Sequence, residues 1–176
     1  MRDRLDPDRT FRNAYLDAVF GSDVTMTVIR RSRTDDLDAL VELGGEYCAA
    51  DGRDFDPATV RAGFAGVVDD DAHGFVLVAE EASDDEGGAI VGYAVVSWGW
   101  SIEIGGLDVV LDEIYVRPQG RGIGGRLLAA VETTCRAADV KRIFLETERP
   151  NARARSWYAE AGFEADDSIW MSKELT

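Results

Sequence analysis

The spacing of apolar residues changes repeatedly along this 176-residue chain, and each change marks a predicted element. Short alternating or continuous apolar runs indicate strands, whereas apolar residues three and four positions apart indicate helices. Runs of the first kind predict strands over residues 25–31, 75–80, 89–98, 108–116, 142–147 and 163–171. Helical spacing predicts helices over residues 34–50, 123–140 and 151–162, and another that begins at Pro57 and has Val60, Phe64 and Val67 on its inner face.

Polar residues at the ends of these runs predict where helices begin and end. Thr34 is a candidate N-cap, and Asp56 followed by Pro57 is a typical helix start. Gly162 is a candidate C′ glycine. The strand over 142–147 follows the strand over 108–116 through one helix, so we expect the two to be parallel. Together these elements predict one α/β domain with a mixed sheet.

The first 25 residues differ from the rest of the chain. They begin with a polar stretch broken by proline, and Phe11, Tyr15, Ala18 and Val19 could form one face of a short helix. We therefore divide the chain into an N-terminal extension, 1–25, and a domain, 26–176. An appended helix and an upstream start codon both explain the extension.

A glycine-rich loop between a strand and a helix is the most informative motif in the chain. Its residues are Gln119-Gly120-Arg121-Gly122-Ile123-Gly124-Gly125. Glycines let the backbone approach a ligand closely, and the helix N-terminus adds N–H groups and the positive end of its dipole. Such a loop suits a diphosphate. The spacing Gly120-x-Gly122-x-x-Gly125 also satisfies the dinucleotide fingerprint, but Arg117-Pro118-Gln119 separate it from the strand end, which disfavours that alternative.

The segments around this loop resemble the GNAT N-acetyltransferase superfamily over residues 26–171. The strand LDEIYV, the loop QGRGIG and the following helix resemble its motif A, and RIFLETE with NARARSWYAEAGF resembles its motif B. The resemblance implies a mixed sheet flanked by helices, with two parallel strands that splay apart. It also implies acetyl-CoA as cosubstrate, held by the glycine loop and by backbone N–H groups of Ile114, Tyr115 and Val116.

The resemblance implies direct transfer of an acetyl group to an amine, for which this chain has three candidate catalytic side chains. Asp112 and Glu113 are adjacent strand residues that should point to opposite faces. We interpret Asp112 as the base and Glu113 as the anchor of a cationic substrate. Tyr158 is the candidate general acid, and it lies two helical turns after Asn151, as in the family's motif B. Asn151 could cap that helix or contact the cofactor.

The sequence says less about the amine that accepts the acetyl group. Residues 92–116 resemble the corresponding run of spermidine/spermine N-acetyltransferases, which favours a small primary or polyamine-like amine. Trp98 and Trp100 could hold a cationic amine by cation–π contact, or could pack at the contact of a homodimer. A protein N-terminus or lysine is an alternative acceptor, and a non-catalytic acyl-CoA-binding module is an alternative function.

Composition limits the environment and the partners that we expect for this protein. The net charge is −15, with 34 acidic residues against 19 basic ones, spread along the chain. A diffuse acidic shell indicates adaptation to high salt, and the absence of a basic stripe disfavours nucleic-acid binding. No apolar run approaches the ~18–20 residues of a membrane helix. One histidine and two cysteines disfavour a metal site and a disulfide framework, so we expect a cytoplasmic enzyme without a metal.

Overall fold

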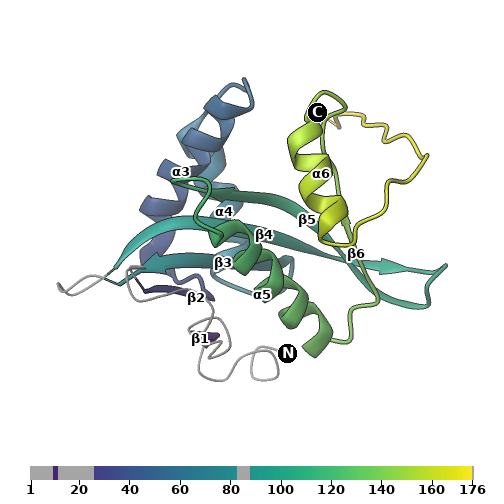
Figure 1. The fold of residues 1–176 in the computed structure, drawn as a ribbon, viewed down its shortest axis with the longest axis horizontal. Helices are drawn as coiled ribbons and strands as arrows, with labels where there is room; N and C mark the ends of the chain where they lie inside the picture. Colours follow the sequence, from purple (N-terminus) through teal and green to yellow (C-terminus); the bar gives the residue numbers. More distant parts are fainter. Residues whose placement is uncertain (1–9, 12–25, 83–87, 176) are drawn as a thin grey trace. The chain divides into compact units, whose positions relative to one another are not determined.

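The computed structural model describes residues 10–11, 26–82 and 88–175, and it divides into the units Met1–Leu145 and Glu146–Thr176. The first unit is a six-stranded sheet in the order β1-β2-β3-β4-β5-β6 (Figure 1). Its strands are β1 (Thr10–Phe11), β2 (Thr27–Arg31), β3 (Gly74–Glu81), β4 (Ala89–Ser101), β5 (Gly106–Val116) and β6 (Arg142–Leu145). Its helices are the 3-10 turn η1 (Thr34–Asp36), α3 (Leu37–Ala50), α4 (Pro57–Val68) and α5 (Ile123–Ala137).

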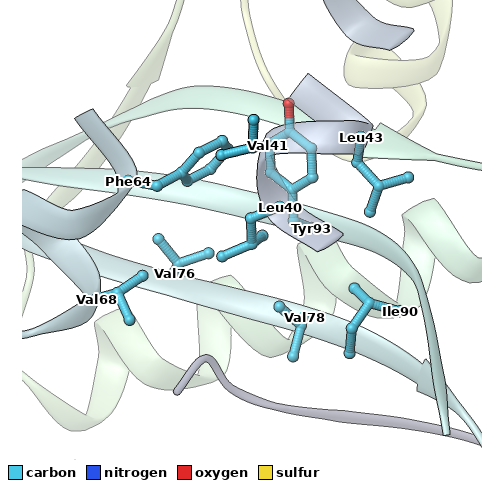
Figure 2. Packing of buried hydrophobic residues seen from close by; sticks show 9 residues of the cluster. All are labelled: Leu40, Val41, Leu43, Phe64, Val68, Val76, Val78, Ile90 and Tyr93. Atoms are coloured by element: carbon cyan, nitrogen blue, oxygen red, sulfur yellow. The ribbon is translucent and has the colours of Figure 1, made fainter. Parts of the chain in front are cut away.

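Helices α3 and α4 pack on one face of this sheet. The buried cluster between them and the strands is shown in Figure 2 and consists of Leu40, Val41, Leu43, Phe64, Val68, Val76, Val78, Ile90 and Tyr93. Val76 and Val78 alternate along β3 and therefore share this face. Within this cluster, Tyr93 is the one residue with a polar side-chain atom, its hydroxyl.

Helix α5 covers the opposite face. Phe75 and Leu77 alternate with the residues of the first cluster and are fully buried. The apolar stripe predicted for this helix is also buried, at Ile123, Leu127, Leu128, Val131 and Cys135. The sheet therefore has a packed helical layer on each side, as expected for a mixed α/β sheet.

The strand pairing of β5 differs on its two sides. Antiparallel pairing with β4 runs from Gly106 to Val116, whereas parallel pairing with β6 covers only Asp108 to Leu111. The predicted parallel pair is confirmed. Because β6 ends at Leu145, its pairing partner β5 outruns it, and the two parallel strands part at this point.

The helix starts test two predictions from the sequence. The Asp56 carboxylate accepts hydrogen bonds from the backbone N–H groups of Ala58 and Thr59, so the predicted start of α4 is confirmed. The prediction that Thr34 caps the first helix is wrong. Its hydroxyl donates to Asp69, and the Asp36 carboxylate accepts the N–H of Arg33 at 2.7 Å instead, which tightens the first turn into η1.

The second unit contains α6 (Ala152–Glu160), which begins as predicted. The Asn151 side chain accepts the N–H of Ala154 at 3.1 Å, so its capping role is confirmed. Gly162 has a φ of 91°, and the N–H of Phe163 reaches the carbonyl of Tyr158, which ends the helix as expected for a C′ glycine. The predicted strand over 163–171 is wrong: the described residues 163–175 have no strand pairing, and alternation alone supplies no partner.

The N-terminal extension is described only at Thr10 and Phe11. These residues form β1, which pairs antiparallel with Ile29 and Arg30 of β2. The other positions of the predicted short helix, at 12–25, lie outside the described residues.

A buried ion pair ties β2 to η1. The Arg30 guanidinium donates to both oxygens of Asp36, at 2.7 and 2.8 Å, and its Nε donates to Glu80. Both side chains of the Arg30–Asp36 pair are less than a tenth exposed. Burial alone would raise the pKa of Asp36, but the hydrogen bonds from Arg30 and from the Arg33 N–H outweigh it and lower that pKa. Asp36 is therefore ionised in the folded protein throughout the neutral range.

We expect Asp36→Asn to destabilise the fold by about 3 kcal/mol, because it leaves the Arg30 charge buried without its closest counter-charge. Since folding lowers the pKa of Asp36, the stabilisation is present above its unfolded value and is lost as the pH falls through the folded one. The difference between wild type and variant should thus shrink below about pH 4. Urea unfolding at several pH values measures it, with exposed Asp35→Asn as control.

Candidate active site

A β-bulge in β5 places the two acidic residues. Val95 of β4 pairs with Glu113, and Val96 pairs with Leu111, so Asp112 is an extra residue without a partner in the ladder. A bulge interrupts the alternation of side chains and can turn two successive residues to one face. The bulge falls where β5 loses its other neighbour, β6, at Leu111.

Both carboxylates consequently lie on the α3 face of the sheet. Glu113 accepts a hydrogen bond from the Tyr93 hydroxyl at 2.8 Å, and Asp112 accepts one from the Ser97 hydroxyl. Tyr93 and Ser97 are four positions apart on β4 and therefore share a face. The expectation that Asp112 and Glu113 point to opposite faces is wrong, because it assumed a regular strand.

The two carboxylates differ in environment. Asp112 is exposed, whereas Glu113 is half-buried above the core cluster. Burial raises the pKa of Glu113, and the negative charges of Asp112 and Asp51 add to this, while the Tyr93 hydrogen bond and the Arg53 charge act in the opposite direction. A carboxyl group with a raised pKa is suited to exchanging protons nearer neutral pH.

The end of α3 and the loop that follows it supply the groups around Glu113. The Tyr47 ring packs edge-on against Tyr115 at 6.2 Å, and the Arg53 guanidinium lies over the Tyr47 ring, 4.9 Å from its centroid. Arg53 also forms an ion pair with Asp51 at 3.1 Å. The Tyr47 ring and the negative charges of Asp51 and Glu113 thus stabilise a cation here and raise the pKa of Arg53 against the effect of its burial.

A second set of contacts ties α3 to the end of β5. The Tyr115 hydroxyl donates to Glu46 at 3.1 Å, and Arg117 forms ion pairs with Glu42 and Glu46. Arg117 is the first residue after β5 and leads into the glycine loop. These contacts fix the start of that loop against the helix that flanks Glu113.

The glycine loop has the geometry of an anion cradle. Gly120 and Gly122 adopt φ values of 87° and 74°, in the left-handed region that disfavours residues with a side chain. A methyl group added at Gly120, Gly122 or Gly125 would meet no atom within 4 Å, so the loop surface there is open. Gly122 is the N-cap of α5, and the first N–H groups of that helix have no intrahelical partner. Gln119 is exposed beside them. This open loop fits the diphosphate of a nucleotide cofactor.

Two arginines near the cradle, Arg121 and Arg126, bind other groups of the protein. Arg121 forms an ion pair with Glu81 at 2.5 Å, and Arg126 donates to the Thr27 carbonyl at 2.6 Å. Both contacts hold the loop and the first turn of α5 to the far end of the sheet. The cradle therefore presents mainly backbone N–H groups, including those of Ile123, Gly124 and Gly125.

The exposed edge of β5 completes the arrangement. Within the described part of residues 1–145, Ile114, Tyr115 and Val116 pair with β4 only, because β6 ends at Leu145. An unpaired strand edge can bind an extended ligand through main-chain hydrogen bonds. The structure thus brings together the predicted strand edge, the glycine loop and Glu113.

The structure does not bring Trp98 and Trp100 together with the acidic pair. Both alternate with Ser97 on β4 and so belong to the opposite face. The Trp98 ring packs against Phe75 at 5.3 Å, and its indole N–H donates to the Asp71 carbonyl at 2.8 Å. Trp100 is exposed near the tip of the β4–β5 hairpin. The aromatic residues beside Glu113 are instead Tyr93, Tyr47 and Tyr115.

Tyr158 and Asn151 belong to the second unit. Tyr158 is half-buried on α6, and its ring contacts those of Trp157 at 4.8 Å and Phe163 at 5.6 Å. Asn151 caps the same helix. The predicted helix start is thus confirmed, and the role of Tyr158 stays a prediction.

Reasoning from the sequence missed Tyr93, Tyr47, Arg53 and Ser97. Tyr93 and Ser97 could have been found by pairing the two strands of the β4–β5 hairpin residue by residue. That pairing, however, requires the position of the bulge to be known. Tyr47 and Arg53 are brought near β5 by the packing of α3, which no local pattern reveals.

Among the described residues, no group of three or more His, Cys, Asp or Glu residues could hold a metal ion, and no helix is long and apolar enough to span a membrane.

Comparison with known proteins identifies the family of this chain. The model of the acetyltransferase (GNAT) family matches residues 39–163, and the chain belongs to this family. The chain is 29% identical over 140 residues to the uncharacterized N-acetyltransferase YhfO of Bacillus subtilis (strain 168), covering 78% of this chain and 90% of that protein. The resemblance found in the sequence, the N-acetyltransferase class and the predicted fold are thus confirmed.

Solved structures show the same fold. An integron cassette protein from the mobile metagenome of Cole Harbour Salt Marsh is 27% identical, with a TM-score of 0.70 over 84% of this chain and 90% of that one. The aminoglycoside N-acetyltransferase AAC(6')-Iy, solved in complex with CoA, is 17% identical, with a TM-score of 0.73 over 89% of this chain and 100% of that one. Acetyltransferases of this family use acetyl-CoA.

We expect Gly122→Val to weaken CoA binding more than tenfold. A β-branched residue at a φ of 74° is strained by roughly 1–2 kcal/mol, and its side chain would fill the open surface of the loop. Isothermal calorimetry with CoA measures the effect. Gly66→Ala, at an exposed position within α4, is the matched control and should leave CoA affinity unchanged. A folded Gly122→Val protein that binds CoA normally would exclude this loop as the diphosphate site.

Proposed function

We propose that this protein transfers the acetyl group of acetyl-CoA directly to a primary amine of a small cationic acceptor. The observation that carries the proposal is the position of Glu113: a half-buried carboxyl group with a raised pKa, on a strand whose next residues form an unpaired edge. That edge runs into an open glycine cradle. One strand thus leads from a proton acceptor to a diphosphate-binding loop.

The cradle and the strand edge would hold the cosubstrate. We assign its diphosphate to the backbone N–H groups of residues 119–125 and its pantetheine arm to Ile114, Tyr115 and Val116. Acetyl-CoA, when bound, supplies the acetyl group as a thioester. Asn151 is a further candidate contact of the cofactor, besides its role as helix cap.

Glu113 is the better candidate for the general base. An ammonium group must lose a proton before its nitrogen can attack a carbonyl carbon, and the base must be ionised at the working pH while still basic enough to take that proton. A raised pKa makes Glu113 a better proton acceptor than an ordinary glutamate, and its half-buried position keeps it apart from bulk water, whereas Asp112 is exposed. We therefore propose the reverse of the assignment made from the sequence, with Asp112 as an anchor for positive charge on the acceptor.

Tyr158 is proposed as the acid that protonates the departing thiolate. A phenol has an ordinary pKa near 10, close to that of a thiol, so the proton transfer is nearly balanced. The support is its spacing from the capping residue Asn151, which matches the family's motif B.

A cationic acceptor is supported by the charges around Glu113. Among the described residues, Arg53 is the cation that acts on Glu113, against the negative charges of Asp112 and Asp51, and the Tyr47 ring lies under that guanidinium. Polyamine-like amines and aminoglycoside-like amines share this chemistry. A protein N-terminus or lysine remains the alternative acceptor, and a non-catalytic acyl-CoA-binding module remains the alternative function.

The acidic composition supports a proposal about setting. With a net charge of −15, self-repulsion is strong in dilute buffer and is screened by molar salt. We propose a halophilic, cytoplasmic enzyme, in keeping with the free cysteines Cys48 and Cys135. A homodimer with Trp98 and Trp100 at its contact stays a prediction, and Trp100 is exposed near the tip of the β4–β5 hairpin.

A turnover screen in molar KCl tests the function. Thiol release from acetyl-CoA is followed with diamines, polyamines, amino acids, an aminoglycoside and a lysine-containing peptide. Acetylation of a small cationic amine supports the proposal. Saturable CoA binding without turnover of any amine would favour the non-catalytic module, and turnover of the peptide alone would favour a protein acetyltransferase.

With the best acceptor, Glu113→Gln and Asp112→Asn should fail in different ways. Glu113→Gln should lower kcat by roughly 10²–10⁴ because no carboxylate takes the proton. Asp112→Asn should mainly raise KM for the cationic amine, about fivefold, because it removes an exposed ground-state contact. Steady-state kinetics separate the two, with exposed Glu103→Gln as control. Near-wild-type kinetics in both variants would contradict the proposed roles.

Tyr158→Phe should lower kcat by roughly 10²–10⁴ and change CoA affinity little. The ring contacts with Trp157 and Phe163 survive the substitution, so only the hydroxyl is lost. Steady-state kinetics and CoA calorimetry measure the two effects on the same preparation. A kcat within a few-fold of wild type would assign thiolate protonation to water or to another group.

A further inference from the structure

A fully buried tyrosine lies beneath the proposed base. Tyr93 is 0% exposed, and its ring packs against Phe64 at 5.3 Å and Tyr115 at 6.3 Å. Figure 2 shows its hydroxyl at the rim of the core cluster, pointing away from Val76 and Val78. From there it donates to Oε2 of Glu113 at 2.8 Å.

Packing does not explain this hydroxyl. A phenylalanine would fill nearly the same volume and keep both ring contacts, without a polar group to be satisfied inside the core. The pKa of Tyr93 is raised far above its ordinary value by burial and by the negative charge of Glu113. The phenol therefore stays protonated over the whole working range and acts only as a donor.

The bond changes what Glu113 can do. A long glutamate side chain at a strand bulge has several rotamers, and a donor fixed in the core selects those that place Oε2 over it. Oε1 is then left for another proton-bearing group. Hydrogen bonding also favours the ionised form of the carboxyl group, against the burial that favours the neutral form.

We propose that Tyr93 is a positioning residue for the general base, whose buried phenol holds Oε2 of Glu113 so that Oε1 receives the proton of the acceptor's ammonium group. The proposal rests on the proposed function. In the step, the N–H bond of the ammonium breaks and an O–H bond forms on Oε1, which leaves a neutral amine and a neutral carboxyl group. Tyr93 keeps its proton throughout.

The other charged or titratable groups that face this pair come from three elements. Asp112 lies beside Glu113 on β5, and Tyr115 of the same strand packs against the Tyr93 ring. Asp51 and Arg53 follow α3, and Tyr47 and Cys48 belong to the end of α3 itself. Loss of the Tyr93 hydroxyl leaves all of these in place. The pKa of Glu113 should then rise further, because the interaction removed is one that lowers it.

The test uses Tyr93→Phe in the full chain and two readouts. The titration of Glu113 is followed by NMR of ¹³C-labelled glutamate carboxyl groups, with the signal assigned by its loss in Glu113→Gln. The pH profile of kcat/KM is measured with the acceptor from the turnover screen. We expect both the titration and the acid limb of the profile to move to higher pH, and kcat/KM on the plateau to fall about tenfold.

Ser97→Ala is the matched control. It removes a hydroxyl donor from the same strand and face, but that donor serves Asp112 instead of Glu113. The titration and the acid limb should stay at their wild-type pH in this variant. A shift as large as that of Tyr93→Phe would show a general disturbance of β4 and would overturn the proposal.

A double-mutant cycle separates the positioning role from the base assignment. If Tyr93 acts through Glu113, Tyr93→Phe should cost nothing further in a Glu113→Gln background. Equal losses in both backgrounds, or an unmoved titration in Tyr93→Phe, would overturn the positioning role while leaving the base assignment intact. Should the acid limb survive in Glu113→Gln, the base assignment fails instead, and the NMR titration still reports whether Tyr93 controls the carboxyl group.

Discussion

The pairing of β5 is the constraint on which the rest of the structure depends. Full-length pairing with β4 anchors the strand in the sheet, and the short parallel pairing with β6 releases its other edge after Leu111. An unpaired strand edge is normally a liability, because it can pair with another chain. In this fold it lies beside a glycine loop and a bulge, so one irregular strand places an edge, an anion cradle and two carboxylates within the same unit.

The buried carboxylate of Asp36 and the half-buried one of Glu113 show how differently the chain treats negative charge. Asp36 is paired at short range with Arg30, and its pKa is lowered. Glu113 has a neutral phenol as its hydrogen-bond donor and Arg53 only as a more distant charge, and its pKa is raised. The first arrangement keeps a charge fixed and ties β2 to η1. The second keeps a proton exchangeable, which is what a general base requires.

The contacts of α3 explain how the surroundings of Glu113 and the glycine loop are held in fixed positions relative to each other. Glu46 accepts a hydrogen bond from Tyr115 on β5 and forms an ion pair with Arg117 at the start of the loop. Tyr47, the next residue, packs against Tyr115 and lies under the Arg53 guanidinium. A movement of this helix would therefore be felt both at the strand edge and around Glu113. The exposed Arg53, stacked on Tyr47, marks where positive charge is stabilised in the described protein.

The sequence by itself determined the order of helices and strands from β2 to α6, the glycine loop, and the helix caps at Asp56 and Asn151. These follow from local properties, since periodicity, glycine conformations and capping hydrogen bonds involve residues close in the chain. It did not determine the bulge at Asp112, and the faces of Asp112 and Glu113 were therefore predicted wrongly. The position of Trp98 relative to these two residues was left open. Nor did it reveal Tyr93 beneath Glu113, or that residues 163–171 form no strand. Those features depend on which backbone groups find partners across the sheet and on what packs above them, and only the tertiary structure decides both.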